Sequence, residues 1–138
     1  MITNKRVAID TNILIYALDT AYPSKKQLSE NIINEYPFIC SQNISEFANV
    51  CLRKFKFEKQ VTIDIINKLL KKCILISCKS STYLLTERLI KQYQLQLFDA
   101  IIIASAIDSK CEILYSEDLH NGLLIDNQLL IQNPFINK

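Results

Sequence analysis

Short apolar runs alternate along this chain with longer segments in which apolar residues recur every three or four positions. The short runs predict strands at residues 7–9, 38–40, 74–76, 113–115 and 123–125. The longer segments predict helices at residues 12–18, 24–36, 43–55, 62–72, 82–93 and 99–108. Continuously apolar strands separated by helices are typical of a parallel sheet covered on both faces. We therefore expect one α/β domain over residues 1–138, with a mostly parallel central sheet of four or five strands.

Two of the expected helices carry recognisable signals at their first residues. Ser24 and Gln27 have the spacing of a capping box and predict the start of the helix at 24–36. Asp99 is a good N-cap residue and stands directly before Ala100 and Ile101. The helix that follows Asp99 is apolar nearly all round, so we expect it to be buried.

Composition excludes several classes of protein. Hydrophobic residues make up 49% of the 138 residues and charged residues 22%, as in ordinary globular domains. Gly122 is the only glycine, so phosphate-binding loops, dinucleotide-binding turns and the serine-hydrolase elbow, which all need several glycines, are absent. The net charge of +2 does not by itself indicate nucleic-acid binding. No apolar run is long enough to span a bilayer, and a strand begins close to the N-terminus, so we expect a cytoplasmic protein without membrane contact.

The five cysteines give no sign of a metal site or of a disulfide framework. Their number is odd, no pair has C-x-x-C spacing, and they stand within apolar runs. A thiol in such a run behaves as a small hydrophobic group. We therefore expect reduced core residues at Cys40, Cys51, Cys73, Cys78 and Cys111.

Acidic residues follow two of the expected strands directly. Asp10 comes after the strand at 7–9, and Ser116-Glu117-Asp118 come after the strand at 113–115. Because open parallel sheets bind ligands outside the carboxyl ends of their strands, both groups are expected at one edge. Asp10-Thr11-Asn12 contains more capping-type residues than one helix start requires. Both Asp10 and Asp99 therefore remain open to two interpretations, as helix caps or as ligands of a cation.

Two further candidates stand on the helix at 43–55. Glu46 lies nearly opposite the apolar stripe of that helix, a position typical of a solvated face, although a polar face lining a cleft has the same pattern. Arg53 shares the face of Glu46 and is either part of a solvated helix end or a phosphate contact beside the acids. Carboxylates gathered from distant parts of a chain are a way to hold Mg²⁺ or Mn²⁺, which prefer oxygen ligands.

Four motifs in order make the chain resemble the PIN domain superfamily, and within it the VapC-type toxin ribonucleases, over nearly its whole length. The motifs are Asp10-Thr11-Asn12, Ser45-Glu46, Asp99 to Ala106 and Ser116-Glu117-Asp118. The resemblance implies a PIN-like three-layer sandwich, and it reverses the interpretation of Glu46 in favour of a site residue. The last motif leaves open whether Glu117 or Asp118 reaches the metal, and its pattern favours Asp118.

The resemblance also implies the chemistry, which is hydrolysis of RNA phosphodiester bonds with Mg²⁺ (or Mn²⁺) as cofactor. It makes Asp10 and Asp99 the main metal ligands, with Glu46 and Asp118 completing the site partly through metal-bound water. It assigns ligand orientation or phosphate contact to Thr11, Asn12 and Ser116. Four neighbouring carboxylates repel one another, so some should have raised pKa values without metal.

The partners that the resemblance implies are an RNA substrate, a small antitoxin protein and a second copy of the chain in a homodimer. The antitoxin's C-terminal segment would pack into a groove between the helices at residues 12–18, 24–36, 44–55 and 62–72.

Three other functions are open to test. A non-catalytic PIN-like module for RNA binding or assembly would not need the full acid set. A phosphotransfer enzyme of the haloacid dehalogenase type would use Asp10 as nucleophile, but it needs a second acid two residues on, where this chain has Asn12. A metal-dependent nuclease acting on DNA is disfavoured by the small size of the chain and by its lack of extra DNA-binding elements.

Overall fold

Six strands in the order β3-β2-β1-β4-β6-β5 form the central sheet of the computed structural model, which describes residues 5–136. The strands are β1 Val7–Ile9, β2 Phe38–Cys40, β3 Ile74–Ile76, β4 Ile113–Tyr115, β5 Leu124–Ile125 and β6 Leu129–Gln132. The helices are α1 Thr11–Leu18, α2 Pro23–Ile33, α3 Ser41–Arg53, α4 Lys59–Leu70, α5 Ser80–Tyr93 and α6 Leu97–Asp108. All neighbouring strands pair in parallel except β5, which runs antiparallel to β6.

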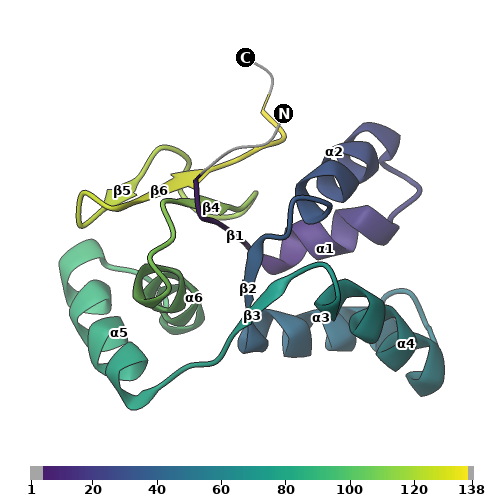
Figure 1. The fold of residues 1–138 in the computed structure, drawn as a ribbon, viewed down its shortest axis with the longest axis horizontal. Helices are drawn as coiled ribbons and strands as arrows, with labels where there is room; N and C mark the ends of the chain where they lie inside the picture. Colours follow the sequence, from purple (N-terminus) through teal and green to yellow (C-terminus); the bar gives the residue numbers. More distant parts are fainter. Residues whose placement is uncertain (1–4, 137–138) are drawn as a thin grey trace.

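The helices cover both faces of the sheet. Figure 1 shows α5 and α6 on one side of the strands and α1 to α4 on the other. Alternate residues of β1 enter the two cores, since Ala8 packs with α5 and α6 while Ile9 packs with α1, α3 and α4. The predicted α/β three-layer sandwich with a mostly parallel sheet is therefore confirmed.

The sheet has one strand more than the four or five that the sequence predicted. The additional strand is β6, which forms a hairpin with β5. Asp126 and Asn127 in the turn both have φ of 53°, and the Gln128 N–H donates to the carbonyl of Ile125 at 2.9 Å. Two left-handed residues in succession match the twist of a tight hairpin, and Asp and Asn tolerate this conformation better than most residues.

The predicted helix starts each lie one to three residues too late, with the largest error at α4, which begins at Lys59 and not at residue 62. Two of the predicted starts rested on capping-type residues, and these caps are wrong. The helix α2 begins at Pro23 after Tyr22, and no side-chain cap is formed, so the capping box at Ser24 does not exist. Proline suits the first helical position because its fixed φ is already helical and it has no N–H to leave unpaired. The helix α6 begins at Leu97, so Asp99 lies in the first turn and is not the N-cap. The prediction that this helix is buried is confirmed for residues 100–106.

All five cysteines are free thiols, as expected, but they are not all core residues. Cys40, Cys51 and Cys111 are buried, whereas Cys73 and Cys78 are partly exposed. The Sγ atoms of Cys40 and Cys78 lie 3.7 Å apart, where β2 and β3 end side by side. Among residues 5–136, no helix has the length and apolar character needed to cross a bilayer.

Candidate active site

Asp10 stands at the carboxyl end of β1 and begins α1. Its carboxylate accepts hydrogen bonds from the Thr11 N–H at 2.8 Å, from Asn43 Nδ2 at 3.1 Å and from Ser116 Oγ at 2.7 Å. Its N–H donates to the carbonyl of Tyr115, the last residue of β4. The residue is only 8% exposed. Asp10 is therefore the cap of α1, and it also joins the ends of β1 and β4, as the parallel-sheet argument predicted.

A second set of hydrogen bonds joins α1 to α3. Thr11 Oγ1 donates to Glu46 Oε2 at 3.1 Å and accepts from Asn43 Nδ2 at 2.8 Å. Gln42 Nε2 contacts the other oxygen of Glu46 at 3.3 Å. Glu46 is exposed, but its carboxylate faces the start of α1. The polar face of α3 thus borders the same edge of the sheet as Asp10.

The acids that follow β4 point in different directions. Asn12 Nδ2 donates to Asp118 Oδ2 at 3.3 Å, so Asp118 lies beside the start of α1. The carboxylate of Glu117 instead accepts hydrogen bonds from Lys25 Nζ and from the Tyr16 hydroxyl, both at 2.6 Å. Burial opposes ionisation of Glu117, but these two donors outweigh it and hold its pKa below the usual value. The sequence left open whether Glu117 or Asp118 reaches the metal. In the structure Asp118 lies beside the start of α1, and Glu117 points to Lys25 and Tyr16.

Asp10 is in electrostatic range of Glu46 and Asp99, and Asp99 is also in range of Glu46 and Asp118. We call these four residues the acidic cluster. Burial raises the pKa of Asp10, and the charges on Glu46 and Asp99 add to the rise, while hydrogen bonds such as that from Ser116 oppose it. Burial also raises the pKa of Asp99, with further contributions from Glu46 and Asp118. Desolvation thus contributes more than the mutual repulsion that the sequence argument invoked. No ion pair in residues 5–136 involves a member of the acidic cluster.

The donor chemistry of the acidic cluster fits Mg²⁺ or Mn²⁺. Every donor is a carboxylate oxygen, and none is neutralised by a basic side chain. Within the described part of the chain, no three acidic, histidine or cysteine side chains converge closely enough to hold an ion by themselves. Mg²⁺ normally keeps several water ligands and needs only one or two carboxylates. The arrangement therefore fits a hydrated ion and not a closed protein cage.

Two predicted residues, Glu117 and Arg53, lie apart from this cluster, and three others were missed. Arg53 is exposed, and its Nε donates to Asn49 Oδ1 at 2.9 Å, with no contact to the acids. No sequence pattern pointed to Asn43, Lys25 or Tyr16 as neighbours of the acids. Asn43 stands three residues before Glu46, so both lie on one face of the helix. This spacing could have identified Asn43 as a neighbour of Glu46.

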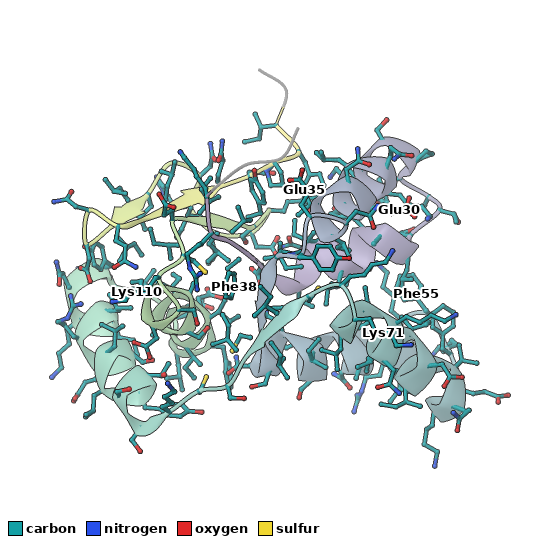
Figure 2. The ribbon with its side chains drawn as sticks, viewed as in Figure 1. Glu30, Glu35, Phe38, Phe55, Lys71 and Lys110 are labelled. Carbon is teal, nitrogen blue, oxygen red and sulfur yellow. The ribbon has the colours of Figure 1, made fainter. Side chains whose placement is uncertain are left out.

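A cavity and a groove, both lined by residues 5–136, lie away from the acidic cluster. One of about 280 Å³ is at the amino ends of β1 and β2, and Figure 2 labels Glu35 and Phe38 in its wall. The other, of about 340 Å³, is a groove between α1, α2 and α4. Apolar residues such as Leu18, Ile65 and Leu69 line this groove, and Glu30, also labelled in Figure 2, borders it. The groove matches the predicted antitoxin site in α1, α2 and α4, but α3 does not line it.

The fold and the order of the acidic motifs define the class of protein. Residues 7–120 match the PIN domain family, and the chain therefore belongs to that family. No curated protein matches the sequence.

Solved structures of toxin–antitoxin proteins have a similar fold. VapBC2 from Rickettsia felis, bound to a DNA fragment from its promoter, has a TM-score of 0.66 and 19% identity, covering 92% of this chain and 97% of that chain. A toxin–antitoxin complex from Klebsiella pneumoniae has a TM-score of 0.66 and 23% identity, and the match covers 94% of this chain and 98% of that chain. VapC20 of Mycobacterium tuberculosis, a toxin that cleaves the sarcin–ricin loop, has a TM-score of 0.64 and 11% identity. The match covers 81% of this chain and 89% of that chain. The resemblance to VapC-type proteins is confirmed at the level of the fold.

Proposed function

We propose that this PIN domain protein is a metal-dependent endoribonuclease, the toxin of a VapBC-type toxin–antitoxin pair that acts in the cytoplasm. The observation that carries the proposal is the acidic cluster, in which four carboxylates from separate parts of the chain interact without a basic partner. Such a cluster costs stability in the absence of a cation, which is typical of a site kept for catalysis. A non-catalytic module would have no use for it.

The side chains around the cluster have distinct roles in this proposal. Bound Mg²⁺ or Mn²⁺ supplies an activated water and neutralises charge on the phosphate and on the leaving oxygen. Asp10 and Asp99 would hold the ion, and the bonds from Ser116 and Asn43 fix the carboxylate of Asp10 for this. The exposed carboxylates of Glu46 and Asp118 would hold water of the hydration shell.

Thr11 and Asn12 would position these outer acids, because they donate to Glu46 and to Asp118 respectively. Ser116 fixes Asp10 in the same way. Glu117 is bound to Lys25 and Tyr16 and takes no part in the metal site. Arg53, on the polar side of α3, would contact phosphate of an RNA strand that extends beyond the cluster.

The groove between α1, α2 and α4 supports the antitoxin as partner. Its apolar floor and its rim of Glu30, Lys68 and Lys72 suit an amphipathic segment of a small protein. Two of the structural neighbours are toxin–antitoxin complexes, which supports the same partner. We also propose a homodimer, in line with the resemblance to this class of toxin.

The direct test is cleavage of RNA by the purified chain. We expect a single-stranded RNA to be cut when Mg²⁺ or Mn²⁺ is present and to remain intact with EDTA, whereas DNA of the same sequence is not cut. In cells, sequencing RNA 5′ ends after a pulse of expression should reveal specific new ends that are absent with Asp10→Asn. Equal cleavage of DNA would favour the DNA nuclease, and binding of RNA without cleavage in either metal would favour the non-catalytic module.

A further inference from the structure

Lys25 on α2 lies at the centre of a group of side chains next to the acidic cluster. Its Nζ donates to Glu117 Oε2 at 2.6 Å and to the Tyr16 hydroxyl at 3.2 Å. The Tyr16 hydroxyl in turn donates to Glu117 Oε1 at 2.6 Å. The same Nζ lies 4.6 Å from the ring centroid of Tyr16, 5.5 Å from that of Phe135 and 5.6 Å from that of Tyr22. We call Tyr16, Lys25 and Glu117 the Lys25 cluster.

The rings around Lys25 are packed against one another, so they define where its ammonium group lies. Tyr16 contacts Tyr22 and Phe135 edge to face, with centroid distances of 5.5 Å and 5.0 Å. A cation held against aromatic faces is attracted by their electron density and restricted in position. Lys25 is therefore a fixed partner for Glu117, although the two residues are 92 positions apart in the sequence.

The position of Glu117 bears directly on Asp118, the next residue. The Glu117 N–H donates to Oδ1 of the Asn12 side chain at 3.2 Å. The Nδ2 atom of the same Asn12 side chain donates to Asp118 Oδ2. Ser116 Oγ, on the other side of Glu117, accepts the Leu119 N–H at 3.3 Å. The turn after β4 is thus held through its backbone N–H groups by Asn12 and Ser116, and through the side chain of Glu117 by Lys25 and Tyr16. Asp118 is thereby kept beside the start of α1, where Asn12 also contacts it.

We propose that Lys25 and Tyr16 are positioning residues of the metal site, which act by anchoring Glu117 so that Asp118 faces the cation. The proposal rests on the proposed function in so far as the acidic cluster binds Mg²⁺ or Mn²⁺. None of the three residues touches the ion or the RNA. The anchor also keeps Glu117 away from the cation, which Asp10 and Asp99 would hold directly and Glu46 and Asp118 through water.

Binding of Mn²⁺ to the full chain, measured by the electron paramagnetic resonance signal of the free ion, tests the proposal without requiring catalysis. Lys25→Met keeps the aliphatic stem among the rings but removes the charge, and Glu117→Gln removes the charge of the partner at constant size. We expect each variant to weaken Mn²⁺ binding about 10-fold, as is usual when outer partners of metal ligands are lost. Lys25→Arg keeps the positive charge and has enough N–H donors for both Glu117 and Tyr16, so it should bind Mn²⁺ within about twofold of the wild type.

The signs of these changes separate positioning from simple electrostatics. If only net charge mattered, Lys25→Met would tighten Mn²⁺ binding and Glu117→Gln would weaken it, because one change removes a positive charge and the other a negative one. Anchoring predicts that both weaken binding, and that the double variant is no weaker than either single one, since the pair acts as a unit. Lys26→Met, which removes the neighbouring lysine paired with Glu30 at 3.3 Å, is the matched control for charge.

The possible outcomes bear differently on the two proposals. Wild-type affinity in both Lys25→Met and Glu117→Gln overturns the positioning role and leaves the nuclease assignment intact. Tighter binding in Lys25→Met, or an equal loss in Lys26→Met, overturns it as well. A wild-type chain that binds Mn²⁺ but does not cut RNA overturns the nuclease assignment, while weakened binding in the variants still supports the positioning role. A chain that does not bind Mn²⁺ overturns both.

Discussion

Replacing Asp10 by asparagine is expected to reduce metal-dependent RNA cleavage by about a thousandfold or more, the effect of losing several kcal/mol of stabilisation from a directly bound ion. Asn is nearly identical in size and is an equally good N-cap, so α1 keeps its first turn. The Ser116 hydroxyl can accept as well as donate and can therefore pair with the new amide. The measurement is the single-turnover rate of cleavage at saturating Mn²⁺.

The same variant should be more stable than the wild type when no metal is bound. Burial raises the pKa of Asp10 in the folded chain above its pKa in the unfolded chain. The fold therefore loses stability as the pH rises from the unfolded pKa to above the folded pKa, because the carboxylate then ionises inside the protein. At pH 7 we expect Asp10→Asn to raise Tm by about 3–5 °C, the shift that about 1 kcal/mol produces in a domain of this size. Below about pH 3 the difference should disappear, because that pH lies under the ordinary pKa of an aspartate and the wild-type carboxyl is then neutral in the folded and the unfolded state.

Asp19 provides a matched control for Asp10. It is at the other end of α1, where its side chain accepts the Ala21 N–H at 3.0 Å, and it has no contact with the acidic cluster. Asp19→Asn should leave the cleavage rate within about twofold of the wild type, as expected of a substitution away from the site. Metal-dependent cleavage retained in Asp10→Asn, or a lower Tm without metal at pH 7, would contradict the role assigned to Asp10.

Asp99→Asn is expected to lower the cleavage rate by about a hundredfold or more, because it removes the second of the two carboxylates proposed to bind the ion directly. The fold should be unaffected. Asp99 is partly exposed in the first turn of α6, whereas residues 100–106 hold the helix in the core. The loss of a first-turn acid costs about 0.3–1 kcal/mol through the helix dipole. Relief of the burial of the charge, and of its repulsion by Glu46 and Asp118, opposes this cost.

The control for Asp99 is Asp64→Asn on α4, where the carboxylate is exposed and accepts only from Gln60 at 3.1 Å. Rates for both variants should be measured over a range of Mn²⁺ concentrations. A weakened ligand set raises the concentration needed for half-maximal rate as well as lowering the maximum. An unchanged rate and metal dependence in Asp99→Asn would remove this residue from the site.

Most of the fold could be predicted because its signals are local. The strands at 7–9, 38–40, 74–76 and 113–115 are short apolar runs, and the structure places them at the predicted residues. The hairpin of β5 and β6 was only half predicted, since its turn uses Asp126 and Asn127 in place of glycine and gives a weaker signal. The starts of α2 and α6 were misplaced because capping-type residues were taken as first residues, whereas Tyr22 and Gln96 precede these helices.

The site could be predicted only as far as sheet geometry and the family resemblance reach. Parallel strands bring the ends of β1 and β4 together, and this places Asp10 beside Ser116. Periodicity could not show that the Glu46 carboxylate faces the start of α1, because a helix face that borders a cleft has the same pattern as one that faces solvent. The pairing of Lys25 with Glu117 depends on how α2 packs beside the turn after β4, which no local pattern encodes.

The measurement that tests the account most directly is the anomalous diffraction of crystals of this chain grown with Mn²⁺. Because the acidic cluster is proposed to share a cation, we expect an anomalous peak about 2.0–2.3 Å from carboxylate oxygens of Asp10 and Asp99, close to octahedral oxygen coordination. Glu46 and Asp118 should contact its water ligands, and Glu117 should remain bound to Lys25. Crystals in millimolar Mn²⁺ with no peak at the cluster, or with Mn²⁺ held elsewhere on the chain, would contradict the account.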